Sequence, residues 1–457
     1  MSIFGAGGED KREKGTIFDK NIDSIILASK RLDLTVSQIA FGEGQSGTGK
    51  KITNGFGKKP VNFSSENYRA HIQDLIQRIK SGEIKRSGNK LIVTMLTHGG
   101  KKMQGIQTHT IAVSGSKLRS SNANPSQKDE SMDPFFELVQ VAKKYGVQLA
   151  ILDLSCHSGE SLRLESDSAC VITGSGPDHP SYGSFVDLLF SKMKAGSSIE
   201  EAFLLARAED NSPSFPMIST RFGKWSSKIL YKLVKPYLYY HSPDELSSNL
   251  KDYLESSVGC MDGCTADEDH ESLVSLVKKT KDFGDTVLSE VERNELLKEL
   301  QKYKEFQDQI LEEMQFTKFP LLKTTEKIEI SIVINNKTVS QEEEFSWKEI
   351  LFSYPESSID YFQKKLKAAK GSDRQDEMMN IARFEKIKQR RYEILKENEQ
   401  LKDVPSVYDQ LNQHAEKTRQ SAYKISGLMN KMFVGYYRMF IKKYPEQKKS
   451  ACSDFIL

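Results

Sequence analysis

The sequence predicts an α/β fold, in which a mostly parallel sheet flanked by helices is followed by a mainly helical C-terminal domain. In the first half of the 457-residue chain, short runs rich in Ile, Val and Leu alternate with longer helical patterns, which is the order of a mostly parallel sheet. In the second half the composition shifts to Lys and Glu with long helical periodicity. A chain of this length exceeds one ordinary core, so we expect two main domains.

The strands expected in the first domain are apolar runs bounded by Gly, Ser or charged residues. They cover residues 24–28, 36–41, 90–96, 147–152 and 169–173. Helical patterns lie between and after these runs, at about residues 66–80, 134–145, 182–194 and 199–209. The segment 108–114 follows residues 90–96 closely enough to form a hairpin at the edge of the sheet.

The domain division expected from these patterns has four parts. They are a flexible N-terminus at 1–20, an α/β domain at 21–222, a connecting segment at 223–265 that packs on this domain, and a helical domain at 266–457. Helices beyond residue 222 are expected at 243–256, 270–281, 285–313, 361–369, 375–400 and 408–443, with an inserted β-hairpin at 327–340. An apolar stripe from Ile425 to Phe440 is typical of core packing, and a partner-binding surface is the alternative.

Charge and cysteine content limit the partners and the location. The net charge of +3 is too small to indicate a nucleic-acid partner by itself. Five cysteines, at positions 156, 170, 260, 264 and 452, are sparse and irregularly spaced, which argues against a disulfide framework and for a reducing compartment. No run of about 18 apolar residues is present, and residues 1–20 lack the apolar core of a signal peptide. We therefore expect a soluble, cytoplasmic protein without a membrane partner.

Two motifs that follow apolar strands carry the candidate chemistry. Residues 153–159 read DLSCHSG, and residues 97–100 read THGG. Because the carboxyl ends of parallel strands meet at one edge of a sheet, the thiol of Cys156 and the imidazole of His98 are expected to lie together. A thiolate attacks far better than a thiol, and an imidazole within reach can take the proton. The pair therefore predicts a nucleophile with its base.

Gly99 adds a further element to this predicted site. A glycine lets a substrate carbonyl approach the backbone closely, so the N–H of Gly99 can donate to a developing oxyanion. The N–H of Cys156, at the turn after its strand, can point into the same space. His157 is expected to be structural, because adjacent residues at a strand end diverge.

These motifs resemble those of the caspase-like cysteine peptidases, and the CHSG string at 156–159 is closest to the metacaspase branch. Residues 171–178 resemble the next strand and specificity loop of that family, and residues 197–220 resemble its last helix and strand entry. The resemblance covers roughly residues 20–222. It implies a caspase-like fold and a cysteine endopeptidase in which His98 is base and general acid and Cys156 is the acyl-forming nucleophile, with the N–H groups of Gly99 and Cys156 as oxyanion hole.

The residues expected to contact substrate are Asp178, Asp153 and Ser155. Metacaspase-like motifs usually place an acid two residues before the cysteine, whereas Leu154 occupies that position here and Asp153 lies one residue further back. Asp178 matches an acidic position in the loop after the following strand, which implies cleavage after Arg or Lys because a carboxylate selects a cation. Stabilisation of a turn is the alternative role of Asp178.

Other interpretations stay open. The domain could be a catalytically inactive caspase-like module that binds extended peptides, or a hydrolase of another ester or amide. Residues 44–50 read GQSGTGK, which fits the start of a phosphate-binding loop, although Lys51 replaces the Ser or Thr that would hold magnesium. Cys260 and Cys264 lack the paired spacing of a zinc site.

We expect no cofactor and no bound metal, and a need for calcium is not readable from the sequence. The expected partners are protein or peptide substrates, and a regulatory protein that binds the C-terminal helical domain. Nucleic acid and membrane are not expected as partners.

Overall fold

The computed structural model describes residues 1–5, 17–42, 46–114, 129–238, 267–313, 324–334, 337–351, 355–367, 372–402 and 404–457. The chain divides into two compact units, which are described separately. The first unit contains residues 1–238, 265–300 and 422–457, and the second contains residues 239–264 and 301–421.

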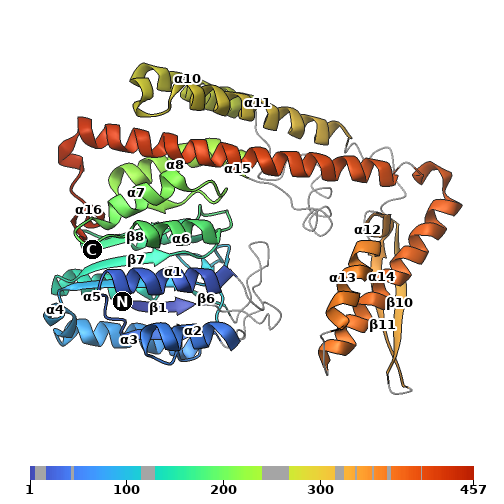
Figure 1. The fold of residues 1–457 in the computed structure, drawn as a ribbon, viewed down its shortest axis with the longest axis horizontal. Helices are drawn as coiled ribbons and strands as arrows, with labels where there is room; N and C mark the ends of the chain where they lie inside the picture. Colours follow the sequence, from blue (N-terminus) through green and yellow to red (C-terminus); the bar gives the residue numbers. More distant parts are fainter. Residues whose placement is uncertain are drawn as a thin grey trace. The chain divides into compact units, whose positions relative to one another are not determined.

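The first unit is built on a six-stranded sheet with the order β2-β1-β3-β7-β8-β9 (Figure 1). The strands are β1 (Ser2–Gly5), β2 (Gln38–Phe41), β3 (Lys90–Leu96), β7 (Gln148–Asp153), β8 (Ala169–Thr173) and β9 (Met217–Ile218). All neighbouring strands pair in parallel except β8 and β9, which are antiparallel. The predicted α/β class with a mostly parallel sheet is therefore confirmed.

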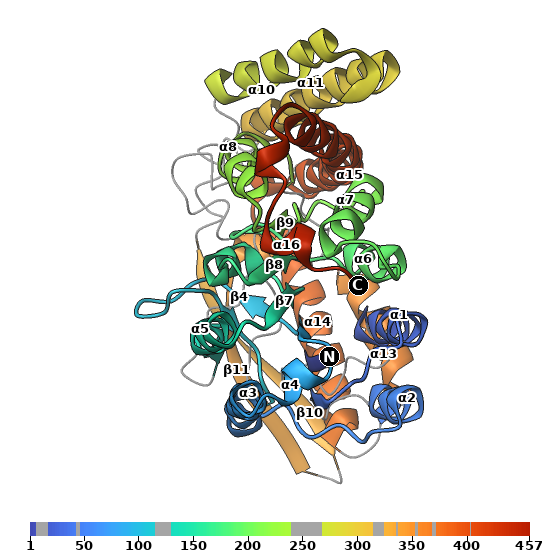
Figure 2. The same cartoon turned by 90° about the vertical axis from the view of Figure 1, so that its left-hand side faces the viewer.

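Helices cover both faces of this sheet (Figure 2). One face carries α3 (Ser65–Lys80) and α5 (Phe135–Tyr145), and the other carries α1 (Ile17–Arg31), α2 (Ser46–Phe56), α6 (Gly183–Lys192) and α7 (Ile199–Glu209). The core under α3 and α5 includes the rings of Phe4, Tyr68 and Phe135, which are buried and in mutual contact. Two short elements, α4 (Glu83–Arg86) and the 3₁₀ helix η1 (Ser158–Leu164), complete this part.

Two predictions near the N-terminus are wrong. Residues 24–28 lie in helix α1 and not in a strand. The buried residues Ile22, Ile25 and Ile26 recur at helical spacing, while Leu27 is 64% exposed, so the apolar run marks one face of a helix. The segment 1–20 is not simply a flexible terminus, because β1 lies between β2 and β3 and α1 begins at Ile17.

The C-terminal part of the chain returns to the first unit. Its elements there are α8 (Arg221–Leu238), α10 (Asp267–Lys279), η2 (Thr280–Thr286), the start of α11 (Glu290–Glu313), the end of α15 (Val404–Lys443), η6 (Pro445–Gln447) and α16 (Ala451–Asp454). The ring of Phe222 lies 6.0 Å from that of Phe433 and 5.1 Å from that of Tyr437. The apolar stripe on α15 is therefore core packing. The division expected at residue 222 differs from this one, since that residue lies inside α8 and residues 265–300 and 422–457 belong to the first unit.

A disulfide joins Cys170 of β8 to Cys452 of α16, across 282 residues of sequence. The sparse, irregular cysteines gave no sign of this pair, because the two partners meet only through the return of the C-terminal segment to the sheet. A disulfide is typical of an oxidising compartment, whereas the sequence indicated a reducing one. The cytoplasmic location stays a prediction. Within the ranges that the structure covers, no helix has the length and apolar content needed to cross a membrane.

The second unit contains the predicted hairpin and a set of helices. Strands β10 (Thr325–Ile334) and β11 (Lys337–Ser346) pair antiparallel, as expected. The helices are α12 (Trp347–Leu351), α13 (Pro355–Leu366), α14 (Ser372–Glu397) and η5 (Glu399–Leu401). Phe362 of α13 stacks on Phe384 of α14 with 5.7 Å between ring centroids. The helix expected at 243–256 and the pair Cys260 and Cys264 lie outside the described residues.

Candidate active site

The sheet register brings the two predicted motifs to one edge. Met95 of β3 is the direct partner of Asp153 of β7, and the N–H of Leu154 donates to the carbonyl of Met95 at 2.9 Å. His98 and Cys156 each lie three residues beyond a member of this pair. Because β3 and β7 run in parallel, both chains leave the sheet on the same side and at the same level.

Gly99 is where these two chain segments touch. A Cβ atom built on Gly99 would lie 2.0 Å from the carbonyl oxygen of Cys156 and 2.9 Å from its nitrogen. Any side chain would collide with backbone, which cannot move aside cheaply. The sequence analysis explained Gly99 by the approach of a substrate carbonyl. The structure gives another reason for glycine at this position, which is the close approach of the two backbone segments. The N–H of Gly99 still favours the ionised form of the Cys156 thiol.

A small antiparallel sheet holds the His98 segment in place. Strand β4 (Gly99–Gly100) pairs with β5 (Thr110–Ile111), which pairs with β6 (Glu130–Ser131). The N–H of Ala112 donates to the carbonyl of His98 at 2.9 Å. This arrangement confirms the hairpin predicted near residues 108–114. The side chain of His98 is left partly exposed at the edge of the sheet.

Cys156 combines partial exposure with a backbone partner that the sequence did not suggest. The N–H of Ser181, in the loop before α6, donates to the Cys156 sulfur at 3.3 Å. Burial of the thiol raises the pKa of Cys156, while the N–H groups of Ser181 and Gly99 act in the opposite direction. The resting group is thus a protonated thiol that faces backbone donors able to stabilise negative charge.

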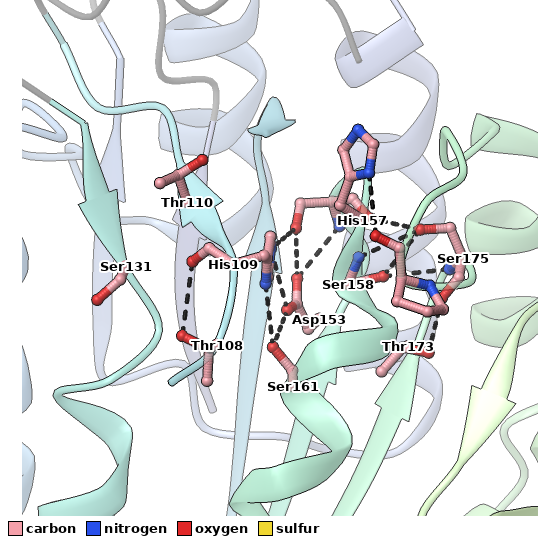
Figure 3. A network of polar contacts seen from close by, with 12 residues as sticks. Thr108, His109, Thr110, Ser131, Asp153, His157, Ser158, Ser161, Thr173 and Ser175 are labelled. Atoms are coloured by element: carbon pink, nitrogen blue, oxygen red, sulfur yellow. Dashed lines mark hydrogen bonds and ion pairs between the residues drawn. The ribbon is translucent and has the colours of Figure 1, made fainter. Parts of the chain in front are cut away.

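Asp153 lies in a buried network with His109 and Ser161 (Figure 3), and Ser155 belongs to the same network. The carboxylate of Asp153 accepts hydrogen bonds from the hydroxyls of Ser155 at 2.6 Å and Ser161 at 2.5 Å. Nε2 of His109 lies 2.9 Å from the Ser155 hydroxyl, and burial lowers the pKa of His109, opposed by Asp153. All four side chains are at most 1% exposed. The substrate-binding role expected for Asp153 and Ser155 is therefore wrong, because their polar atoms are used inside the protein.

A second set of contacts fixes the other side of the Cys156 loop. The hydroxyls of Ser158 and Ser175 lie 3.2 Å apart, and Nδ1 of His157 lies 3.1 Å from the carbonyl of Pro177. His157 has a φ of 59°, and its side chain is buried. The structural role expected for His157 is thus confirmed. Together with the Asp153 network, these contacts hold the chain segments before and after Cys156. Figure 3 shows His157, Ser158 and Ser175 beside that network.

Asp178 is the one predicted substrate-binding residue that reaches the surface. Its side chain is 43% exposed and forms an ion pair with Lys235 of α8 at 3.1 Å. Its N–H donates to the hydroxyl of Tyr231, which lies 2.6 Å from Nδ1 of the buried His179. Burial lowers the pKa of His179 to about 3, so this histidine is neutral. The carboxylate of Asp178 can therefore bind a cation, and the ammonium group of Lys235 already contacts it.

Four residues of this region were missed by sequence reasoning: His109, Ser161, Ser181 and Lys235. Each meets its partner through tertiary structure: His109 and Ser155 are 46 positions apart in sequence, and Lys235 and Asp178 are 57 positions apart. His109 stands in a short segment without periodicity, and Lys235 stands among other lysines of a helix. Neither position carries a local signal that distinguishes it.

The remaining motifs gain no chemical role. Residues 46–56 form helix α2, in which Lys50 is exposed. Residues 44 and 45 of the glycine-rich segment lie outside the described residues. Across the described ranges, no three His, Cys, Asp or Glu residues are grouped so that they could hold a metal ion.

We expect the rate of Cys156 alkylation by iodoacetamide to rise with pH through a midpoint above that of an ordinary thiol. Only the thiolate reacts, and burial disfavours it in the folded state. The unfolded chain loses this proton first as the pH rises, so the contribution of this thiol to stability falls above the ordinary thiol pKa. Mass spectrometry of Cys156 in the folded and the urea-unfolded chain measures both midpoints. Equal midpoints would contradict the burial effect.

Comparison of the chain with family models, with curated proteins and with solved structures found no match.

Proposed function

We propose that the chain is a caspase-like cysteine endopeptidase that cleaves after Arg or Lys, with Cys156 as nucleophile and His98 as base. The observation that carries this proposal is the close contact between the two motif segments. The contact is so close that a Cβ atom added to Gly99 would lie 2.0 Å from the Cys156 carbonyl oxygen. Two motifs 58 residues apart in sequence are held backbone to backbone at one edge of the sheet.

In the proposed reaction the Cys156 sulfur attacks the substrate carbonyl carbon while His98 takes the thiol proton. The carbonyl oxygen becomes an oxyanion that accepts hydrogen bonds from the N–H groups of Gly99 and Cys156. His98 then gives the proton to the leaving amine as the C–N bond breaks, which leaves an acyl-enzyme. Water attacks the acyl carbon with His98 again as base, the thiol is regenerated, and the carboxylic acid is released.

The raised pKa of Cys156 determines how this reaction starts. Because the resting thiol is protonated, proton removal accompanies the attack and does not precede it. The base is therefore essential near neutral pH. The anchored loop contributes by holding the sulfur in one position, which lowers the entropic cost of reaching the transition state.

Asp178 is proposed to bind the basic side chain before the cleaved bond. Its exposed carboxylate already pairs with the ammonium group of Lys235, so the position accommodates a cation. A substrate Arg or Lys would replace Lys235 or share the carboxylate with it.

We expect Asp178→Asn to reduce the preference for Arg over Leu at this position by roughly tenfold to a hundredfold, because a charge-assisted hydrogen bond contributes about 1.5–3 kcal/mol. Cleavage rates for two peptides that differ only in this residue measure the preference. The matched control is Asp167→Asn, which removes an exposed carboxylate paired with Lys143 outside the site. An unchanged preference in Asp178→Asn would assign that residue to turn stabilisation.

The proposed activity is tested by incubating wild type and Cys156→Ala with a diverse peptide library and mapping the cuts by mass spectrometry. The proposal predicts cuts after Arg or Lys with the wild type and none with the variant. Equal cutting by both proteins would contradict it, and so would an intact library in both samples.

The alternative function is a catalytically inactive module that binds extended peptides. Two observations favour it: the pKa of Cys156 is raised, and Asp178 already has an internal partner. This alternative predicts that a fluorescent Arg-containing peptide binds wild type and Cys156→Ala with the same affinity and is recovered intact from both.

A further inference from the structure

The exposed face of α8 carries a feature that the proposed proteolysis does not use. This helix contains one arginine and four lysines but no acidic residue. Its opposite face packs on the first unit, whereas Trp225 is 59% exposed and Ile229 is 44% exposed. These two side chains are one helical turn apart, so they form a continuous apolar strip among the cations. An exposed apolar strip of this kind marks an interaction site more often than a single exposed residue does.

The C-terminal segment extends the same surface. The ring of Phe222 contacts those of Trp225 at 5.7 Å and Phe440 at 4.8 Å, and Phe440 contacts Tyr444 at 5.2 Å. Tyr444 is 40% exposed. The chain of ring contacts places the end of α15 beside the start of α8, as Figure 2 also shows. Two exposed aromatic residues therefore share one side of the first unit.

Cations surround these aromatic residues. We define the basic–aromatic face by two groups of exposed residues. The apolar group is Trp225, Ile229 and Tyr444, and the cations around it are Arg221, Lys224, Lys228, Lys232, Lys443, Lys448 and Lys449. Lys224 pairs with Glu165, and Arg221 donates to the side chain of Gln447 at 2.6 Å. None of the carboxylates within the described ranges forms an ion pair with Lys228, Lys232, Lys448 or Lys449.

Carboxylates near this face offset only part of its charge. A polar pocket of about 530 Å³ between α8 and the C-terminal segment is lined by Arg221 and Lys449, and also by Glu165, Asp167 and Asp454. Glu165 and Asp167 already pair with lysines. The seven cations of the face outnumber the three carboxylates that line this pocket together with the exposed Glu446. The face is therefore complementary to a negatively charged surface.

We propose that the basic–aromatic face binds the surface of an anionic phospholipid bilayer. The lysines would attract the helix to anionic headgroups, while Trp225 and Tyr444 occupy the interface and Ile229 enters the apolar boundary. A nucleic acid fits less well, because contacts to phosphates and bases leave the exposed Ile229 without a role. The proposal departs from the sequence-based expectation of no membrane partner, which rested on the absence of a long apolar run and of a signal peptide.

The test uses the full chain and its own tryptophan. The sequence contains two tryptophans, so Trp347→Phe leaves Trp225 as the only one. This protein is mixed with vesicles of phosphatidylcholine, either pure or with roughly one third phosphatidylserine. The proposal predicts sedimentation with the anionic vesicles only, a shift of Trp225 fluorescence to shorter wavelength on binding, and release at high salt.

Variants separate the apolar and the charged contributions. In the Trp347→Phe protein, Lys228→Gln with Lys232→Gln should weaken vesicle binding by roughly 25-fold, at about fivefold per cation. In the otherwise natural chain, Trp225→Ser should weaken sedimentation by roughly tenfold. The matched control is Lys59→Gln with Lys85→Gln, which removes two exposed lysines elsewhere on the first unit.

Three outcomes would overturn the proposal. They are no binding to the anionic vesicles, binding that is equal in the charge variant and its control, and tighter binding to single-stranded DNA than to vesicles in the same buffer. None of these measurements involves Cys156 or His98, so they do not depend on whether the chain is a peptidase.

Discussion

Replacing His98 with alanine is expected to lower kcat/KM for peptide cleavage by roughly 10²- to 10⁴-fold, because a positioned general base contributes about that much. This corresponds to about 3–5 kcal/mol of transition-state stabilisation. The loss should be large here because burial raises the pKa of Cys156, so little thiolate forms without a base. The fold should be unchanged, since the His98 side chain is partly exposed at the edge of the sheet.

The measurement is kcat/KM for one Arg-containing peptide between about pH 6 and 10. The His98→Ala protein should recover part of its rate at high pH, where hydroxide forms the thiolate, and on addition of imidazole. Lys102→Ala, which alters an exposed residue of the following loop, serves as control and should keep the wild-type rate. A loss of less than tenfold in His98→Ala would remove this histidine from the proposed dyad.

Gly99→Ala is expected to destabilise the protein by about 3 kcal/mol or more, at or above the upper end of ordinary overpacking. The new Cβ would lie 2.0 Å from the Cys156 carbonyl oxygen and 2.8 Å from its carbonyl carbon. Because both contacts are to backbone, the two segments must separate. Separation would move His98 away from Cys156, so proteolysis should fall at least as far as in His98→Ala.

The free energy of unfolding in denaturant is measured for the wild type, for Gly99→Ala and for the control Gly49→Ala. Gly49 lies in helix α2, and a Cβ there would meet nothing within 4 Å. Gly49→Ala should therefore be neutral or stabilise the protein by up to about 1 kcal/mol, as alanine favours helix. If Gly99→Ala were as stable and as active as Gly49→Ala, the close contact of the two motif segments would be refuted.

The strands that carry the candidate site were predictable from sequence because they are buried on both faces. The apolar runs predicted at residues 147–152 and 169–173 correspond to β7 and β8, which are adjacent parallel strands. Strand β1 was missed because four residues give too short a pattern. Helix α1 was misread as a strand because consecutive isoleucines resemble a buried run, although only two of residues 25–27 face the core.

The order of the two motifs gave the candidate dyad, whereas the surroundings of each residue depended on tertiary packing. Asp153 was expected at the substrate, but alternation along a strand does not distinguish an exposed edge from the closed space that His109 fills. Likewise, nothing near Lys235 indicates that it pairs with Asp178. The return of α15 to the first unit was also hidden, because an amphipathic helix does not reveal which core it covers.

The most direct test of the dyad is the labelling of Cys156 by an electrophilic peptide that carries Arg next to the reactive group, with iodoacetamide as reference. The proposed function predicts stoichiometric modification of Cys156 near neutral pH, at least a hundredfold slower in His98→Ala. Iodoacetamide reports how much thiolate each protein forms, so any slowing with the peptide beyond that with iodoacetamide reports the action of His98 on the bound peptide. If the peptide modifies Cys156 at the same rate in both proteins, and no faster than iodoacetamide does, His98 and Cys156 do not form a catalytic pair.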